Sequence, residues 1–243
     1  MARNTLTLYH GTDLRILEMT KEEREQYKRE CNLVIDALFP LYQPLIKEEM
    51  VEGVCNGNKI YYYEFPLKLK YERLLDEKGE HMYHNLIKAL NNIECRNNNN
   101  GLYQYKDLYV CASKYDAMIY AQSSFAGGET GLIAYRLIKG AEIIGFDNMY
   151  NDPVVKQAAE RIKEFAKEGN ERPAIVTIEN IDIKDLLRED GRPLSDIDLK
   201  LINDFVGVAR FKFRYTKPIE LSQCKVEPLN EELYFRIIKE EEY

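Results

Sequence analysis

The chain begins its first predicted strand with Thr5-Leu-Thr-Leu-Tyr9-His10-Gly11-Thr12. Polar and apolar side chains alternate from Thr5 to Tyr9, which is the pattern of a strand with one buried face. Gly11 then breaks the pattern, so we expect the strand to run into a loop with His10 at its end. A longer strand is predicted at 208–215, where apolar and basic side chains alternate with a period of two.

The remaining elements are inferred from helical and strand patterns along the chain. Pro40 is expected to end the first helix, because proline lacks the amide hydrogen that a helix interior needs. The apolar runs Leu132–Ile138 and Ala141–Phe146 follow a glycine-rich loop and predict buried strands. Ser195 and Asp198 have the spacing of a capping box, which marks the start of a short helix. Helices are predicted at 21–39, 83–93, 114–122, 153–169, 196–202 and 230–243, and further strands at 61–66, 108–111 and 174–178.

The composition is that of a water-soluble globular protein. Of the 243 residues, 45% are hydrophobic and 31% are charged, which excludes a disordered chain. No apolar run approaches the length of a membrane span, and the first residues lack the pattern of a secretory signal. The net charge of −7 disfavours a nucleic acid as the main partner, because phosphate binding usually needs a basic surface. We therefore expect a single domain, residues 1–243, in the cytoplasm.

Neither a disulfide framework nor a metal site is predicted. The five cysteines are scattered and contain no Cys-x-x-Cys pair, which favours reduced thiols. His81 and His84 have a helical spacing that two metal ligands can use. No carboxylate pattern accompanies them, so a surface pair is expected instead.

Two widely separated motifs carry the functional interpretation. The first is Tyr9-His10-Gly11-Thr12, and the second is Tyr109-Val-Cys-Ala-Ser-Lys114-Tyr115-Asp116-Ala117-Met-Ile-Tyr120. Together they resemble the diphtheria-toxin-like, histidine–tyrosine type of ADP-ribosyltransferase, which is related to the catalytic domains of poly-ADP-ribose polymerases. Ala117 follows the toxin type, because the polymerase type has a serine there that bonds the carboxamide of NAD.

The resemblance implies an α+β fold with a split, mostly antiparallel sheet, in which residues 13–100 are a helical insertion. It implies an enzyme that uses NAD as a substrate, releases nicotinamide and transfers ADP-ribose to a macromolecular acceptor, which we take to be a protein. Such an enzyme can also be a toxin or effector delivered into a target cell. An antitoxin or inhibitor therefore stays open as a partner.

The resemblance also assigns residues to the NAD site. Tyr109 and Tyr120 would face each other across a slot for the nicotinamide ring, because aromatic faces attract a flat cation. His10 would hydrogen-bond the adjacent ribose. The backbone of Gly11, next to Thr12, would approach the carboxamide, because no side chain stands in the way.

The family needs a late glutamate whose carboxylate stabilises the oxocarbenium-like transition state as nicotinamide leaves. The first candidate is Asp204, which lies in Asn203-Asp204-Phe205-Val206 ahead of the strand predicted at 208–215, although its side chain is one methylene shorter. Glu220 is the second candidate, and Glu129 in the glycine-rich loop is the third.

Two other functional classes stay open. An RNA 2′-phosphotransferase-like enzyme also begins with His-Gly-Thr, but it depends on further arginines and would favour a basic surface. A non-catalytic module that binds NAD or ADP-ribose is the second alternative. It gains weight because the sequence offers no unambiguous glutamate.

Overall fold

The structure is a computed structural model, and its chain divides into two compact units. The first unit comprises Met1–Glu18, Asn98–Gly128 and Glu171–Tyr243, and the second comprises Met19–Asn97 and Glu129–Asn170. No helix in the described part of the chain is long and apolar enough to cross a membrane. The structure describes residues 5–46, 50–55, 58–63, 82–97, 108–145, 151–189, 191–205 and 211–241.

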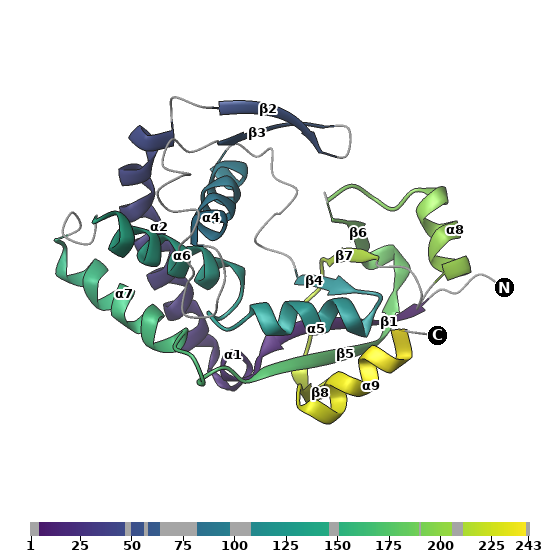
Figure 1. Ribbon diagram of the computed structural model, residues 1–243. Helices are drawn as coiled ribbons and strands as arrows, with labels where there is room; N and C mark the ends of the chain where they lie inside the picture. The colour runs from purple at the N-terminus through teal and green to yellow at the C-terminus, as the bar shows by residue number, and fades with distance from the viewer. Residues whose placement is uncertain are drawn as a thin grey trace. The chain divides into compact units, whose positions relative to one another are not determined.

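An antiparallel sheet forms the centre of the first unit (Figure 1). Among the described residues it has six strands in the order β6-β7-β4-β1-β5-β8, and each neighbouring pair is antiparallel. Together with the helices, this sheet confirms the predicted α+β class. The strands are β1 (Thr5–Asp13), β4 (Leu108–Cys111), β5 (Pro173–Asp182), β6 (Leu186–Arg188), β7 (Lys212–Tyr215) and β8 (Lys225–Pro228).

The sheet consists of two halves joined by a short ladder. β1 and β5 pair along the length of β1, from Thr5 to Asp13. Within the described strands, β1 and β4 share only the register pair Tyr9–Cys111. Fewer backbone contacts therefore join the half β6-β7-β4 to the half β1-β5-β8 than join β1 to β5.

Three helices of the first unit lie where the sequence predicts them. Ser195 and Asp198 form the predicted capping box: the Asp198 amide donates to Ser195 Oγ at 3.2 Å, and the Ser195 amide donates to the Asp198 carboxylate at 2.8 Å. These bonds satisfy amides that have no partner within the helix. The predicted helices are α5 (Lys114–Ser123), α8 (Asp196–Phe205) and α9 (Glu231–Glu241), and the short α1 (Leu14–Glu18) was not predicted.

Apolar side chains pack on both faces of this sheet. On one face, here called the α5 face, Tyr9 and Ile175 pack with residues of α5 and α9. On the other, here called the His10 face, Leu8 and Val176 belong to a larger core that includes Ile202 of α8. The side chains of successive residues of β1 therefore pack on opposite faces of the sheet.

The first strand is longer than predicted. β1 does not end at Gly11 but continues to Asp13, and Gly11 pairs with Ile175 of β5. His10 therefore lies inside the strand and not at its end. The glycine serves packing rather than a turn, because a Cβ atom at this position would overlap the carbonyl oxygen of Ala117. The strand predicted at 208–215 is observed as β7, and residues 206–210 lie outside the described part.

The second unit is mainly helical in its described residues. The helix predicted at 83–93 is confirmed, the helix predicted from Pro153 begins there but ends at Phe165 and not at Gly169, and the strand predicted at 61–66 overlaps β3. The elements are α2 (Lys21–Ile46), β2 (Met50–Cys55), β3 (Asn58–Tyr63), α4 (Met82–Asn97), α6 (Glu129–Ile144) and α7 (Pro153–Phe165).

Two predictions in the second unit are wrong. α2 does not stop before Pro40, because the chain beyond it is held by packing: Tyr42 is fully buried, and its hydroxyl donates to the Leu137 carbonyl at 2.7 Å. The strands predicted at 132–138 and 141–146 fall in α6 as far as that helix extends. Because α6 is buried around much of its circumference, its sequence shows a continuous apolar run that resembles a buried strand.

The predicted helical insertion, residues 13–100, overlaps the second unit from Met19 to Asn97. The second unit also includes Glu129–Asn170, which the sequence does not assign to the insertion. Residues 98–101 of the predicted asparagine-rich loop lie outside the described part, and Asn97 is the last residue of α4.

Candidate functional site

The two motifs come together in the first unit. β1 carries the first motif and pairs with β4, which carries the start of the second. α5 packs on β1 at Gly11, where a Cβ atom would overlap the Ala117 carbonyl oxygen and lie 2.5 Å from the Ala121 nitrogen. The space left by the missing side chain is thus filled by the backbone of α5. The resemblance instead predicts that the carboxamide of NAD approaches the chain at Gly11.

The turn from β4 into α5 is fixed by Ser113. Its Oγ accepts hydrogen bonds from the amides of Tyr115 at 3.0 Å and Asp116 at 3.4 Å. This N-cap satisfies the first amides of the helix. It thereby sets the direction in which α5 leaves the sheet, and with it the position of Ala117 and Tyr120.

The His10 ring links the two motifs directly. Its Nδ1 atom donates to the carbonyl oxygen of Tyr109 at 2.8 Å. Because a carbonyl oxygen only accepts, Nδ1 carries the hydrogen and Nε2 is left as an acceptor. Burial lowers the pKa of His10 from its ordinary value, and the bond to Tyr109 offsets this effect only in part. The imidazole is therefore neutral at pH 7.

A cavity of about 420 Å³ lies beside His10 on the His10 face. Its volume is within the range of small-molecule sites. His10 and Thr12 line it from β1, Tyr215 lines it from the end of β7, and the segment that follows lines it with residues 216–219 and Leu221. Much of the remaining wall is aliphatic, with Ile16, Leu17, Leu108, Val176, Ile178 and Ile219.

The lining suits a ligand that combines an apolar ring with hydroxyl groups. The Nε2 atom of His10 and the hydroxyl of the buried Thr12 can both hydrogen-bond a sugar hydroxyl. Lys217 also lines the cavity, but its ammonium group is paired with Asp185 at 2.7 Å. The cavity therefore presents a few hydrogen-bonding groups within a largely aliphatic wall.

The two predicted slot tyrosines lie on a different face from the His10 ring. Along β4, Val110 belongs to the core of the His10 face, so the alternation of the strand directs Tyr109 to the α5 face. Tyr120, on α5, is 40% exposed, and the Nζ atom of Lys212 lies 5.0 Å from its ring centre. The sheet therefore lies between the side chains of these tyrosines and the His10 ring.

The three acidic candidates have different surroundings. Glu220 is exposed and lies between two residues that line the cavity. Asp204 is the next-to-last residue of α8, and its side chain lies outside the described part. Glu129 begins α6 of the second unit, where its carboxylate accepts a hydrogen bond from Asn92 at 3.0 Å. Glu220 is therefore the candidate whose own segment borders the cavity.

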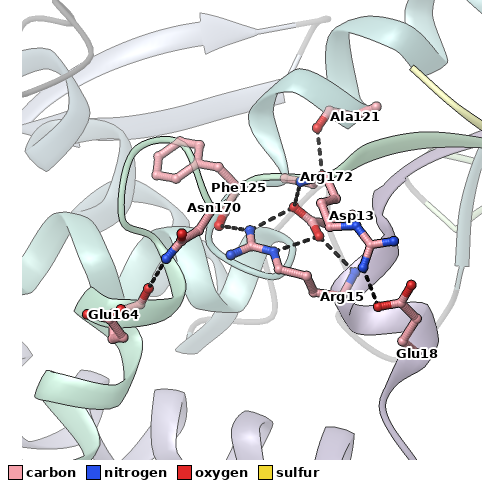
Figure 2. Close-up of polar contacts among 9 residues, drawn as sticks. Asp13, Arg15, Glu18, Ala121, Phe125, Glu164, Asn170 and Arg172 are labelled. Atoms are coloured by element: carbon pink, nitrogen blue, oxygen red, sulfur yellow. Dashed lines mark hydrogen bonds and ion pairs between the residues drawn. The ribbon is translucent and has the colours of Figure 1, made fainter. Parts of the chain in front are cut away.

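Asp13, to which the sequence assigned no role, is a fully buried carboxylate at the end of β1. It accepts bonds from Arg15 Nε at 2.8 Å, Arg15 Nη2 at 2.7 Å, the Arg15 amide at 2.9 Å and the Arg172 amide at 3.0 Å (Figure 2). Burial by itself would raise the pKa of Asp13, but the bonds from Arg15 and Arg172 outweigh it. The pKa therefore lies below its ordinary value.

This buried carboxylate organises the chain next to the first motif. The Nη2 atom of Arg15 also donates to the carbonyl of Phe125 at 2.9 Å, so the end of β1 is tied to the glycine-rich loop after α5 (Figure 2). Arg172 in turn pairs with Glu18 at 2.6 Å. The sequence signal was an aspartate two residues before an arginine, which by itself predicts no more than an exposed turn.

The second motif also contains a thiol, that of Cys111. Burial raises the pKa of Cys111, inside the second motif, to about 12, so its thiol stays protonated. Among the described residues, no group of three or more histidine, cysteine, aspartate or glutamate side chains is placed to hold a metal ion. The side chains of His81 and His84 lie outside the described part.

Comparisons with protein families, with curated proteins and with solved structures find no match to this chain. The functional assignment therefore depends on the residues of the site and on their geometry.

Proposed function

We propose that this chain is an ADP-ribosyltransferase that binds NAD across the junction of β1 and β4. The observation that carries the proposal is the hydrogen bond from His10 to the Tyr109 carbonyl at 2.8 Å. It joins the two motifs that resemble this family. It also leaves Nε2 of His10 as an acceptor beside the cavity, which is what a ribose hydroxyl requires.

In this proposal, the dinucleotide lies at the junction of β1 and β4 and contacts both faces of the sheet. A ribose occupies the cavity against His10 and Thr12, and the nicotinamide ring reaches Tyr109 and Tyr120 past the short ladder. The low pKa of His10 supports this arrangement, because a neutral imidazole does not repel the positively charged nicotinamide.

The proposed reaction is displacement of nicotinamide from its ribose. The bond between the ring nitrogen and the ribose carbon breaks, its electron pair stays with nicotinamide, and a nucleophile of the acceptor protein attacks the same carbon. Positive charge develops on the ribose, so a nearby carboxylate lowers the barrier. Glu220 is favoured for this role because its segment borders the cavity, and Asp204 is the alternative.

Calorimetric titration with NAD, combined with chromatographic detection of released nicotinamide, tests the proposal. We expect wild type to bind NAD and His10→Ala to bind it roughly tenfold more weakly, because the ribose hydroxyl loses its acceptor. Thr7→Ala is a matched control, since Thr7 is exposed on the same strand. Equal affinity in wild type and His10→Ala would contradict the proposed ribose site.

The same experiment separates the two alternatives. Binding of NAD without any release of nicotinamide, even with a cell lysate as a source of acceptors, would indicate a non-catalytic module. Removal of a 2′-phosphate from RNA in the presence of NAD would indicate the phosphotransferase. A wild-type protein that does not bind NAD would contradict the ADP-ribosyltransferase altogether.

A further inference from the structure

We propose that Lys212 binds the diphosphate of the dinucleotide and leaves the ring of Tyr120 to do so. This inference depends on the proposed function. Its geometric basis is the cation–π contact in which Lys212 Nζ lies 5.0 Å from the centre of the Tyr120 ring. The Lys212 ammonium group thus contacts the same Tyr120 ring on which the proposed function stacks the nicotinamide cation.

Strand β7 presents two basic residues beside the second motif. Across the ladder between β4 and β7, Lys212 pairs with Cys111 and Arg214 pairs with Tyr109. Phe213, between the two basic residues, belongs to the core of the His10 face. Because side chains alternate along a strand, Lys212 and Arg214 both lie on the α5 face, which is also the face of the slot tyrosines.

The two basic side chains differ in how accessible they are. Arg214 is 4% exposed and is packed so closely against Gly191 that a Cβ atom there would overlap its guanidinium group. Lys212 is only partly buried. Burial by itself lowers the pKa of Lys212, but its hydrogen bond to Tyr120 and the charges of Glu189 and Asp116 raise it above its ordinary value. Lys212 is therefore a charged group that a ligand can reach.

In the observed contact, the Lys212 ammonium group lies where the nicotinamide ring of NAD would stack on Tyr120. Two cations on one ring face repel each other, so nicotinamide can stack where Lys212 lies only if the lysine moves. In NAD one ribose carries both the nicotinamide and the diphosphate. With this ribose against His10 at the junction of β1 and β4, both groups extend to the α5 face, where the Tyr120 ring and Lys212 lie. The dinucleotide supplies a new cation for Tyr120 and an anion for Lys212.

Three ligands test separately whether Lys212 binds the diphosphate and whether it competes with nicotinamide for the Tyr120 ring. ADP-ribose has the diphosphate without the cationic ring, nicotinamide riboside has the ring without the diphosphate, and NAD has both. We expect Lys212→Met to bind ADP-ribose and NAD about tenfold more weakly at low salt, because a charge-assisted hydrogen bond is lost. The loss should shrink as salt screens the charge. Nicotinamide riboside should bind Lys212→Met at least as tightly as wild type, since the competing ammonium is gone.

Two further variants control the experiment. Lys212→Arg keeps the charge and should retain ADP-ribose binding. Lys184→Met removes an exposed lysine of the same unit, paired with Asp182 at 2.7 Å, and should change none of the affinities. Thermal melts monitored by circular dichroism verify that each variant is folded.

The outcomes distinguish this inference from the proposed function. Equal affinity of Lys212→Met and wild type for ADP-ribose overturns the role of Lys212, while NAD binding and turnover by wild type would still support the transferase. If wild type binds ADP-ribose through Lys212 but does not bind NAD, the transferase is overturned and the anion site is supported.

Discussion

Replacing Asp13 with asparagine tests whether the buried carboxylate holds the end of β1. The two side chains have nearly the same shape, so the change removes charge and acceptor capacity without creating a cavity. One carboxylate oxygen accepts from the amide and Nε of Arg15, and the other accepts from Arg15 Nη2 and the Arg172 amide. Whichever way the new amide is oriented, its NH2 group faces two donors.

The structure allows the size of the effect to be estimated. Asp13 is fully buried and the Arg15 side chain is 16% exposed, so water cannot replace the lost partner. Breaking a buried ion pair from one side costs about 3–5 kcal/mol, and we expect the lower end because the neutral amide is easier to bury. A loss of about 3 kcal/mol corresponds to a fall in Tm of roughly 6–12 °C for a chain of this length.

Urea unfolding followed by circular dichroism measures the effect, and a double-mutant cycle with Arg15→Gln measures the coupling between the two side chains. Asp182→Asn is the control, because Asp182 is a solvent-exposed N-cap and asparagine caps equally well. The pKa of Asp13 lies below its ordinary value of 3.8, so its stabilisation is present above that pH and is lost as the pH falls further. A loss below about 1 kcal/mol, or a coupling energy near zero, would refute the reasoning.

Three further predictions concern the first motif and the acidic group. Gly11→Ala should destabilise the protein by about 3 kcal/mol in urea unfolding, because the new methyl group overlaps backbone atoms of α5 and cannot rotate away; near-neutral behaviour would contradict this packing. Because the pKa of His10 lies below 6.5, its contribution to stability is complete above that pH and declines below it, so the stability of His10→Asn should fall less than that of wild type between pH 6.5 and about pH 5. Glu220→Gln should lower nicotinamide release about a hundredfold while NAD affinity changes little; if Asp204→Asn has that effect instead, the acidic role belongs to α8.

Local signals in the sequence were sufficient to predict where several helices begin. The capping box at Ser195 and Asp198 forms as predicted, because both of its hydrogen bonds join residues of a single turn. Pro153 begins α7 for a similar reason, since proline favours the first turn of a helix, whereas the helix ends at Phe165, before the Gly169 that the sequence took as its end. In each case the energy that decides the structure lies within a few neighbouring residues.

Other elements could not be assigned from local patterns. The run Leu132–Ile138 has apolar residues at nearly every position, so it has neither the period of a helix nor that of a strand. Its conformation is decided by burial on several sides of α6. Pro40 likewise predicts a helix end, but the packing of Tyr42 outweighs the loss of one backbone hydrogen bond.

For the candidate site, the sequence by itself supplied the two motifs on which the proposed function is built: His10 and Gly11 in one, Tyr109 and Tyr120 in the other. Only the tertiary structure decided that the His10 ring bonds the Tyr109 carbonyl and that Lys212 lies over the Tyr120 ring. These contacts join residues far apart in the chain, so they depend on which strands pair and in what register. A shift of register by one residue would turn each side chain to the opposite face of the sheet, and no local pattern of residues specifies that pairing.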